Sequence, residues 1–457
     1  MQKLKSWYTK NRKKILKDYF TLLQFKTISA EKKYFPEMVK CSKWLSDYLK
    51  EVGFESEIIK TKKNPLVFAQ KIKDKKFKTL LIYNHYDVMP VEPIKDWKSD
   101  PFKPKIKEDL VIARGACDNK GQLFYTLTAL KAIYELHNEL NLNIKIIIDG
   151  EEEAGSWGLS SSLNKIKTKL KADDLLVVDM DIPSENTPAI TMGVRGNVTL
   201  EAILTGSNID LHSGSHGGLA YNPLRAVCEL VSKIYKDDGS VNIDHFYDDV
   251  ENTESLEKLY DLEFDEKKYK KEFQIKDLAG EKKFKGIVAN WLRPTVEING
   301  IQGGYTGEGF KTVIPSKVIL KVSSRMVTKQ NPEKIGKLIK EFLEKNCPKE
   351  IDIKVEILDM GWPILSEMES DLVDASIKAY EEVFGKKCKK TLAGGSVPII
   401  GEIANKLKCR TLFMGTSILE DNIHAPNESF SLKRFEKGFY TISKILENFS
   451  KKEIDSD

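Results

Sequence analysis

The chain has few cysteines and no long apolar run. Its 457 residues include six cysteines with neither a C-x-x-C spacing nor a dense framework, so we expect reduced thiols rather than a disulfide scaffold. No segment approaches the run of about eighteen uncharged residues that a membrane span requires. The first twenty residues contain no apolar stretch of signal-peptide length. We therefore expect a cytoplasmic protein with no membrane partner.

The chain also lacks a strong excess of either charge. Lysine and arginine number 73 against 68 acidic residues, which gives a net charge of +5, and the basic residues are spread along the chain. This distribution gives no indication of nucleic-acid binding. With 41% hydrophobic and 31% charged residues, the composition is typical of a globular protein, and the length predicts two or three domains.

Short apolar runs alternate with helical patterns in the first and last parts of the chain. The runs TLLIYNH, NIKIIID and LLVVD are rich in β-forming residues, and each ends on polar groups. Strands separated by helices in this way predict an α/β fold with a mostly parallel sheet. In such a sheet the polar groups gather along the rim formed by the carboxyl ends of the strands.

The pattern changes after Gly196. The next segments read as strand, helix, strand, strand, helix and strand, which is the order of a ferredoxin-like α+β unit. From Trp362 onward the first pattern returns. We therefore predict a discontinuous catalytic domain, residues 1–196 and 359–457, interrupted by an inserted domain, residues 197–358.

Histidines are scarce, and two of the six stand beside carboxylate-rich stretches. Imidazole and carboxylate ligands suit zinc, and they suit manganese and cobalt as well. A metal site with a spare carboxylate is typical of hydrolases. Asp179 closes the run LLVVD, with Asp181 as a nearby competitor. The candidates for this site are His85, Asp118, Glu152, Glu153, Asp179 and His424.

Each of these residues has an ordinary structural explanation when taken alone. His85 and Asp87 are two apart at a strand end, so both side chains point to one face; Asp87 could orient the imidazole, although a histidine there is usually structural. Asp118 precedes a helix, where it could cap that helix or bridge two cations. The glutamates at 151–153 could form a solvated turn, or one could bind metal while its neighbour polarises water.

Three further groups are candidates for contacts with a substrate. The glycine-rich loop DLHSGSHGG carries His212, which could donate a hydrogen bond to a developing oxyanion. Arg325 ends the run KVILKVSSR and could clamp a carboxylate, or it could simply be a surface arginine of a strand. The turn AGGSVP offers the backbone amides of Gly394, Gly395 and Ser396.

These residues, in this order, resemble the dimerising two-zinc peptidase superfamily. That superfamily contains carnosinases, nonspecific dipeptidases, acetylornithine and succinyl-diaminopimelate deacylases, and glutamate carboxypeptidase. The loop around His212 and the long inserted domain are most similar to the carnosinase and cytosolic nonspecific dipeptidase branch. The similarity spans about residues 80–430 and rests on NHYDV, RGACDNKG, DGEEEAGS, VVDMD followed by PAITMGVRG, DLHSGSHGG, GGYTGEGFKTVIPSK, SSRMV, AGGSVP and HAPNE.

The resemblance implies two zinc ions per subunit, with manganese or cobalt as substitutes. His85, Asp118 and Asp179 would bind one ion. Asp118, Glu153 and His424 would bind the other. The resemblance also implies a cis peptide bond directly after Asp118.

The resemblance further implies catalytic roles and a homodimer. Glu152 would be the general base, Asp87 would orient His85, and His212 would reach the active site of the partner subunit. In the mechanism that we expect, Arg325 grips the terminal carboxylate of a small peptide. The inserted domain would serve as a lid and dimerisation domain.

The expected reaction is hydrolysis of dipeptides or short peptides by a metal-bridged hydroxide. The alternative in the same class is an N-acyl amino acid deacylase similar to acetylornithine deacetylase or succinyl-diaminopimelate desuccinylase. A different alternative is a silent dimeric binding protein, against which the complete set of ligand and base residues argues. One departure from the family is that Leu392 and Ala393 replace an Arg-Glu pair before the GGS turn, which alters the wall of the pocket.

Overall fold

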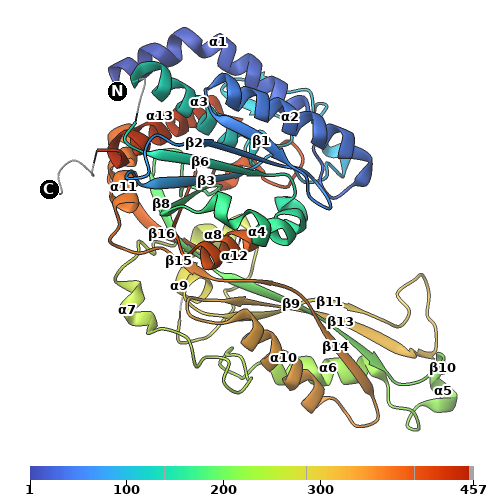
Figure 1. Ribbon diagram of the computed structural model, residues 1–457. Coiled ribbons are helices and arrows are strands. Elements are labelled where there is room, and N and C mark those ends of the chain that lie inside the picture. The colour runs from blue at the N-terminus through green and yellow to red at the C-terminus, as the bar shows by residue number, and fades with distance from the viewer. Residues whose placement is uncertain (138–139, 285, 396, 452–457) are drawn as a thin grey trace. The chain divides into compact units, whose positions relative to one another are not determined.

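The computed structural model describes residues 1–137, 140–284, 286–395 and 397–451 (Figure 1). The chain divides into two compact units. Unit 1 consists of Met1–Gly193, Leu365–Thr391 and Glu402–Asp457, and unit 2 of Val194–Ile364 and Leu392–Gly401. The sequence-based division placed the segment Leu392–Gly401 with the first domain, whereas here it packs with unit 2.

Unit 1 is built on a nine-stranded sheet, and the predicted α/β fold class is confirmed. The four central strands β6, β3, β7 and β17 pair in parallel, whereas β1 pairs antiparallel with β2, β2 with β6, and β8 with β17. The short connection between β1 and β2 explains their antiparallel pairing, because parallel neighbours need a crossover of a dozen or so residues. The sheet order is β1 (Glu55–Ile59), β2 (Leu66–Lys71), β6 (Asn143–Asp149), β3 (Thr79–His85), β7 (Asp174–Val178), β17 (Arg410–Met414), β8 (Ala189–Val194) and β15 (Ile364–Leu365), with β16 (Lys389–Ala393) paired to β8.

Helices cover both faces of this sheet, so the central strands are apolar almost throughout. The residues Leu80 to Tyr83 of β3 and Leu175 to Val178 of β7 are fully buried. On one side of the sheet lie α1 (Gln2–Gln24), α3 (Lys120–His137) and α13 (Leu432–Phe449), and α4 (Trp157–Leu170) lies on the other (Figure 1). The remaining long helices of unit 1 are α2 (Phe35–Glu51) and α11 (Asp371–Phe384).

Unit 2 contains the predicted ferredoxin-like arrangement. Its elements follow one another as β9 (Gly196–Thr205), α6 (Pro223–Ile234), β11 (Thr295–Gln302), β13 (Lys317–Met326), α10 (Pro332–Asn346) and β14 (Asp352–Gly361). The four strands form an antiparallel sheet in the order β11-β13-β9-β14. Alternate residues of β9, from Val198 to Leu204, are buried together with apolar residues of α6 and α10, so one face of the sheet forms the core.

Several smaller elements complete the chain. In unit 1, β4 (Lys105–Lys107), β5 (Leu110–Ile112) and β18 (Ser429–Ser431) form a three-stranded sheet. In unit 2, β10 (Leu211–His212) pairs with β12 (Val313–Ile314) beside α5 (Ser213–His216), and three short helices are α7 (Thr253–Glu257), α8 (Glu266–Glu272) and α9 (Ile287–Trp291). Helix α12 (Pro398–Leu407) begins in unit 2 and ends in unit 1. Within the described ranges, none of the helices combines the length and the apolar character needed to cross a bilayer.

The carboxyl ends of β7 and β17 meet at a very close backbone contact. The amides of Asp179 and Met180 both donate to the carbonyl oxygen of Met414, at 2.9 and 3.1 Å. Gly415 follows directly, and a Cβ atom at this position would lie 1.7 Å from the carbonyl oxygen of Met180. Only glycine allows this approach, so Gly415 fixes the position at which the chain leaves both strands.

We expect the substitution Gly415→Ala to lower the stability of unit 1 by about 3 kcal/mol or more, the upper end of typical overpacking costs, because backbone atoms must move to admit the methyl group. Chemical denaturation followed by circular dichroism measures the effect. The control is Gly300→Ala in β11, where no atom lies within 4 Å of the added Cβ. Equal denaturation midpoints for the two variants would contradict the steric argument.

Candidate metal centre

The predicted metal ligands lie around one rim of the large sheet, where its central parallel strands end. His85 is the last residue of β3, and Asp179 follows β7 directly. The glutamates at 152–153 lie in the turn after β6, and His424 lies in the loop after β17. Asp118 stands two residues before α3. Because parallel strands end at the same edge of a sheet, residues far apart in the sequence are brought together here.

The structure gathers these side chains into two groups that share Asp118. In the first group, His85 Nε2 lies 3.1 Å from Asp118 Oδ1 and 3.6 Å from Asp179 Oδ2. In the second group, His424 Nε2 lies 2.9 Å from Asp118 Oδ2 and 3.1 Å from Glu153 Oε2. Within each group the potential ligand atoms all lie within 4.8 Å of one another. Asp118 therefore presents one carboxylate oxygen to each histidine.

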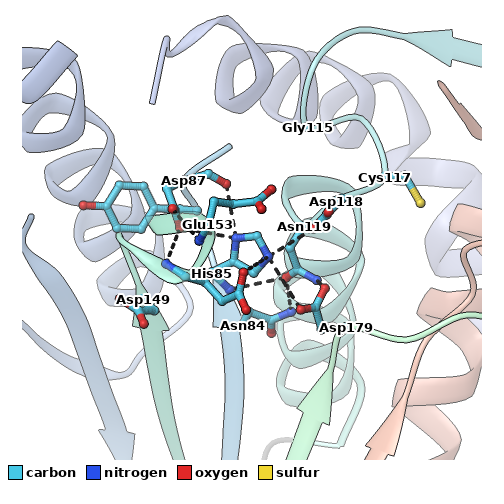
Figure 2. Close-up of polar contacts among 12 residues, drawn as sticks. Asn84, His85, Asp87, Gly115, Cys117, Asp118, Asn119, Asp149, Glu153 and Asp179 are labelled. Atoms are coloured by element: carbon cyan, nitrogen blue, oxygen red, sulfur yellow. Dashed lines mark hydrogen bonds and ion pairs between the residues drawn. The ribbon is translucent and has the colours of Figure 1, made fainter. Parts of the chain in front are cut away.

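Asp87 lies on the other side of the His85 ring (Figure 2). Its carboxylate is fully buried and accepts the backbone N–H groups of Glu152 and Glu153, each at 3.1 Å. Asp87 Oδ1 is also 3.3 Å from His85 Nδ1. The Asp87 carboxylate thus links the turn after β6 to Nδ1 of the His85 ring, while Nε2 of the same ring faces Asp118. An orienting role for Asp87 requires this placement.

Burial and mutual repulsion raise the pKa of most carboxylates in this cluster. Burial raises the pKa of Glu153 to about 7 and that of Asp179 to about 6, and in both cases the nearby Asp118 carboxylate contributes. Burial also raises the pKa of Glu152 well above its ordinary value, and Asp179 adds to the effect while His85 opposes it. Asp118 is the exception: burial acts to raise its pKa, but the two histidines hold it well below the ordinary value.

The pKa values of the two histidines are raised, which favours their protonated, positively charged forms. Burial acts to lower the pKa of His85, but Asp179 and Asp118 outweigh it and the pKa lies well above its ordinary value. The hydrogen bond with Asp118, followed by the one with Glu153, raises the pKa of His424 to about 10. In the metal-free protein, protons on the two imidazoles thus compensate the negative charge of the crowded carboxylates. Divalent cations supply the same compensation, and two groups of imidazole nitrogen and carboxylate oxygen fit zinc, manganese or cobalt.

The turn between Asp118 and α3 contains the cis peptide bond that the family resemblance implies, between Asp118 and Asn119. The Asn119 amide group donates to an Asp179 carboxylate oxygen and to the carbonyl oxygen of Val178, and its own oxygen accepts from Asn84 at 2.8 Å. Sequence analysis did not single out Asn119 or Asn84. Their partners lie at the ends of two different strands, β3 and β7, so no local pattern indicates them.

Glu152 lies beside the first group, with Oε2 4.0 Å from His85 Nε2. It belongs to neither group of three, and its side chain is 17% exposed, so a carboxylate remains available next to the candidate ligands. Asp181, the competitor of Asp179, accepts a hydrogen bond from Ser417 instead and is likewise in neither group.

The predicted substrate-binding residues belong to unit 2. His212 is exposed, its Nδ1 accepts the N–H of Gly214 at 3.1 Å, and its Nε2 lies 3.2 Å from the Thr312 hydroxyl. Arg325 lies on β13, where burial lowers its pKa. The carbonyl oxygen of Gly394 accepts the Arg195 Nε–H at 2.9 Å. Gly395 follows it and accepts from the Arg195 amide at 3.2 Å, whereas Ser396 lies outside the described residues.

Two linked groups of nitrogen and oxygen ligands at the end of a parallel sheet, with a free carboxylate beside them, define a metal-dependent hydrolase. The chain belongs to peptidase family M20/M25/M40, whose model matches residues 81–448. The resemblance inferred from the motifs is thereby confirmed.

Known relatives match this chain over most of its length. It is 30% identical to the Cys-Gly metallodipeptidase dug1 of Schizosaccharomyces pombe over 82% of this chain and 80% of that protein. It is 27% identical to the human Beta-Ala-His dipeptidase over 82% of this chain and 75% of that protein. The crystal structure of the M20 family metallo-carboxypeptidase Sso-CP2 from Sulfolobus solfataricus superposes with a TM-score of 0.85 at 31% identity, covering 95% of this chain and 99% of that one.

We expect zinc, manganese or cobalt to raise the melting temperature of the chelator-treated protein, because each ion relieves repulsion among buried carboxylates. Cation at a hundred times its dissociation constant should add about 2.7 kcal/mol of stability per site. His424→Ala should lose part of this gain, whereas His137→Ala, whose ring contacts Glu447 on α13, should keep all of it. Differential scanning calorimetry measures the shifts, and an equal gain in both variants would refute the assignment of His424.

Proposed function

We propose that this chain is a metal-dependent dipeptidase that hydrolyses dipeptides or short peptides. The observation that carries the proposal is the pair of ligand groups sharing Asp118, with the carboxylate of Glu152 beside them, in a member of a peptidase family. The names of the S. pombe and human relatives, Cys-Gly metallodipeptidase and Beta-Ala-His dipeptidase, support dipeptides as the substrate class. They do not favour the alternative of an N-acyl amino acid deacylase.

The proposed cofactor is a pair of zinc ions per subunit, for which manganese or cobalt can substitute. His85, Asp118 and Asp179 would hold one ion, and Asp118, Glu153 and His424 the other. When bound, such ions polarise the scissile carbonyl group and lower the pKa of water in the site.

Glu152 is the proposed general base. Its carboxylate takes a proton from the attacking water as the carbon–oxygen bond forms, and it delivers that proton to the amide nitrogen as the carbon–nitrogen bond breaks. Partial burial keeps this side chain close to the ligands while one edge still faces solvent. Asp87 fixes the position of this base relative to the ligands, because its carboxylate contacts both the backbone N–H of Glu152 and the ring of His85.

Unit 2 is proposed to recognise the substrate and to form a homodimer, with residues 197–358 as the lid and dimerisation domain. The planar fork of Arg325 suits the terminal carboxylate of a peptide, and the turn at Gly394, Gly395 and Ser396 lines the pocket. His212 would stabilise the oxyanion in the active site of the partner subunit.

Two features of the His212 region support its place in a subunit interface. Its ring is held by the backbone of its own loop and by Thr312, yet it stays exposed. Apolar side chains flanking the same strand pair are also exposed: Ile209 at 62%, Leu219 at 84% and Phe310 at 91%. Large apolar groups exposed together are typical of protein interaction surfaces. All six cysteines carry reduced thiols, which supports the proposed cytoplasmic location.

A second candidate activity is carboxypeptidase action on longer or N-blocked peptides. The similarity to the S. solfataricus metallo-carboxypeptidase favours it, with a higher identity than that to the human dipeptidase. Both activities use the same ligands, base and carboxylate clamp. They differ in whether the residue that precedes the cleaved bond must carry a free amino group.

A substrate panel separates these activities. We expect zinc- or manganese-loaded protein to cleave Cys-Gly, β-Ala-His and Ala-Ala with kcat/KM at least about tenfold above that for N-acetylornithine and N-blocked dipeptides, a difference of about 1.4 kcal/mol in transition-state binding. Fastest turnover of N-acetylornithine would establish the deacylase instead, and fastest turnover of the blocked peptides would establish the carboxypeptidase.

The variant Glu152→Gln tests the general base. It should keep its metal content and lose turnover by about 10²–10⁴-fold.

Subunit mixing tests the role of His212. His212→Ala and Glu152→Gln should each be nearly inactive as homodimers, because every site then lacks one group. After the two are unfolded together and refolded, heterodimers contain one site with both groups, so the mixture should recover about a quarter of wild-type activity. No recovery, with dimers present by sedimentation, would place His212 in its own subunit's site. Wild-type activity of the His212→Ala homodimer would place His212 outside the mechanism.

A further inference from the structure

Glu428 has no assigned role, although it ends the motif HAPNE and its side chain is fully buried in unit 1. Each of its carboxylate oxygens accepts two hydrogen bonds from the turn that leads to α3. Oε2 accepts from Arg114 Nη1 at 2.9 Å and from the Gly115 amide at 2.8 Å. Oε1 accepts from the amides of Cys117 and Asp118, at 2.9 and 3.0 Å.

This arrangement requires a carboxylate. An ionised carboxylate only accepts hydrogen bonds and offers about four acceptor positions, all of which are used here. A glutamine side chain would place its NH₂ group against two N–H donors. The charge of Glu428 is matched by Arg114, which is itself 1% exposed, donates to the carbonyl oxygen of Pro90 at 3.1 Å and lies over the ring of Trp97.

Glu428 and His424 belong to one loop and hold Asp118 from two directions. His424 contacts the Asp118 carboxylate, and Glu428 binds the Asp118 backbone amide. The backbone of this loop is fastened to the same turn, because the Ala113 amide donates to the carbonyl oxygen of Glu428 at 3.1 Å and β18 pairs with β5. The loop that contains His424 and Glu428 therefore positions both the side chain and the backbone of Asp118.

Helix α1 contacts the same turn through a different backbone group. The Tyr19 hydroxyl donates to the carbonyl oxygen of Ala116 at 2.5 Å, and Tyr19 is completely buried against Phe124 and Phe435. The turn is thus bound through its N–H groups by Glu428 and through a carbonyl group by Tyr19. Little freedom remains in the backbone that carries Asp118.

We propose that Glu428 is a positioning residue that keeps the two oxygens of Asp118 divided between the two ligand groups before any cation binds. This inference rests on the proposed function, since it assumes that both groups hold metal. A ligand that is already in place loses less conformational freedom on binding, so cation affinity is higher. Because one residue serves both groups, loss of Glu428 weakens both sites and not only the one that contains His424.

A purely structural role for the buried ion pair is the competing explanation, and the chain offers a matched control. Asp174 is also fully buried and accepts two hydrogen bonds from one arginine, Arg410, both at 2.9 Å. These two residues begin β7 and β17, so they lie at the rim opposite to the ligands. Asp174→Asn removes the same kind of interaction without touching the Asp118 turn.

The experiment compares wild type with Glu428→Gln, Glu428→Asp and Asp174→Asn. Titration calorimetry of the metal-free proteins with zinc or manganese, under chelator competition, gives stoichiometry and affinity, and thermal unfolding of the same samples gives stability. We expect Glu428→Gln to lose about 10–100-fold in affinity at both sites, as is usual when a residue that orients a metal ligand is replaced. Glu428→Asp, which keeps the charge but is one methylene shorter, should lie between. Asp174→Asn should lose comparable stability and keep wild-type affinity.

Equal affinities in Glu428→Gln and Asp174→Asn would overturn the positioning role while leaving the proposed function intact. If Glu428→Gln does not fold, wild-type affinity in Glu428→Asp would overturn it equally. A wild-type protein that binds neither zinc nor manganese would instead remove the proposed function, and this inference with it. With Cys-Gly as substrate, kcat at fixed metal concentration should fall in Glu428→Gln while KM stays near the wild-type value, because unit 2 is unchanged.

Discussion

The division of one carboxylate between two imidazoles is the interaction on which the rest of the site depends. Asp118 contacts both histidines, and each histidine contacts a further acidic residue, so that five groups from distant parts of the chain are linked through one side chain. Such a concentration of acidic groups is unstable unless positive charge is supplied. Burial, and after it the nearby Asp118 carboxylate, raises the pKa of Glu153 and of Asp179. The fold must hold these groups against their repulsion, and most of the polar contacts around the site serve that purpose.

The scaffold provides this restraint through backbone contacts more than through side-chain packing. The amides after β6 are held by Asp87, the chain leaving β7 and β17 is held at Gly415, and the turn at Asp118 is held by Glu428. Two buried carboxylates and one close backbone contact thus restrain ligands that lie at strand ends and in loops. The long apolar strands contribute by ending at the same level, because their buried runs fix their register in the sheet.

Much of this could be predicted from the sequence where a local pattern carries the information. His85 and Asp179 end strongly apolar runs, and the alternation of β9 with its following elements is enough to predict a ferredoxin-like unit. The antiparallel pairing of β1 with β2 was not predicted, because pairing direction there follows from connection length and not from composition. Asn119 and Glu428 were not assigned roles either. The partners of Glu428 lie more than three hundred positions away in the sequence, and a single sequence gives no signal for such pairs.

The two units also separate two kinds of chemistry along the chain. Every described residue of the two ligand groups lies in unit 1, whereas Arg325, His212 and the Gly394–Gly395 turn lie in unit 2. On the proposed assignments, ion chemistry and peptide selection are therefore encoded by different segments. Substitutions in unit 2 that spare His212 can therefore change which side chains or chain lengths are accepted, while the ion-binding rim of unit 1 is inherited unchanged.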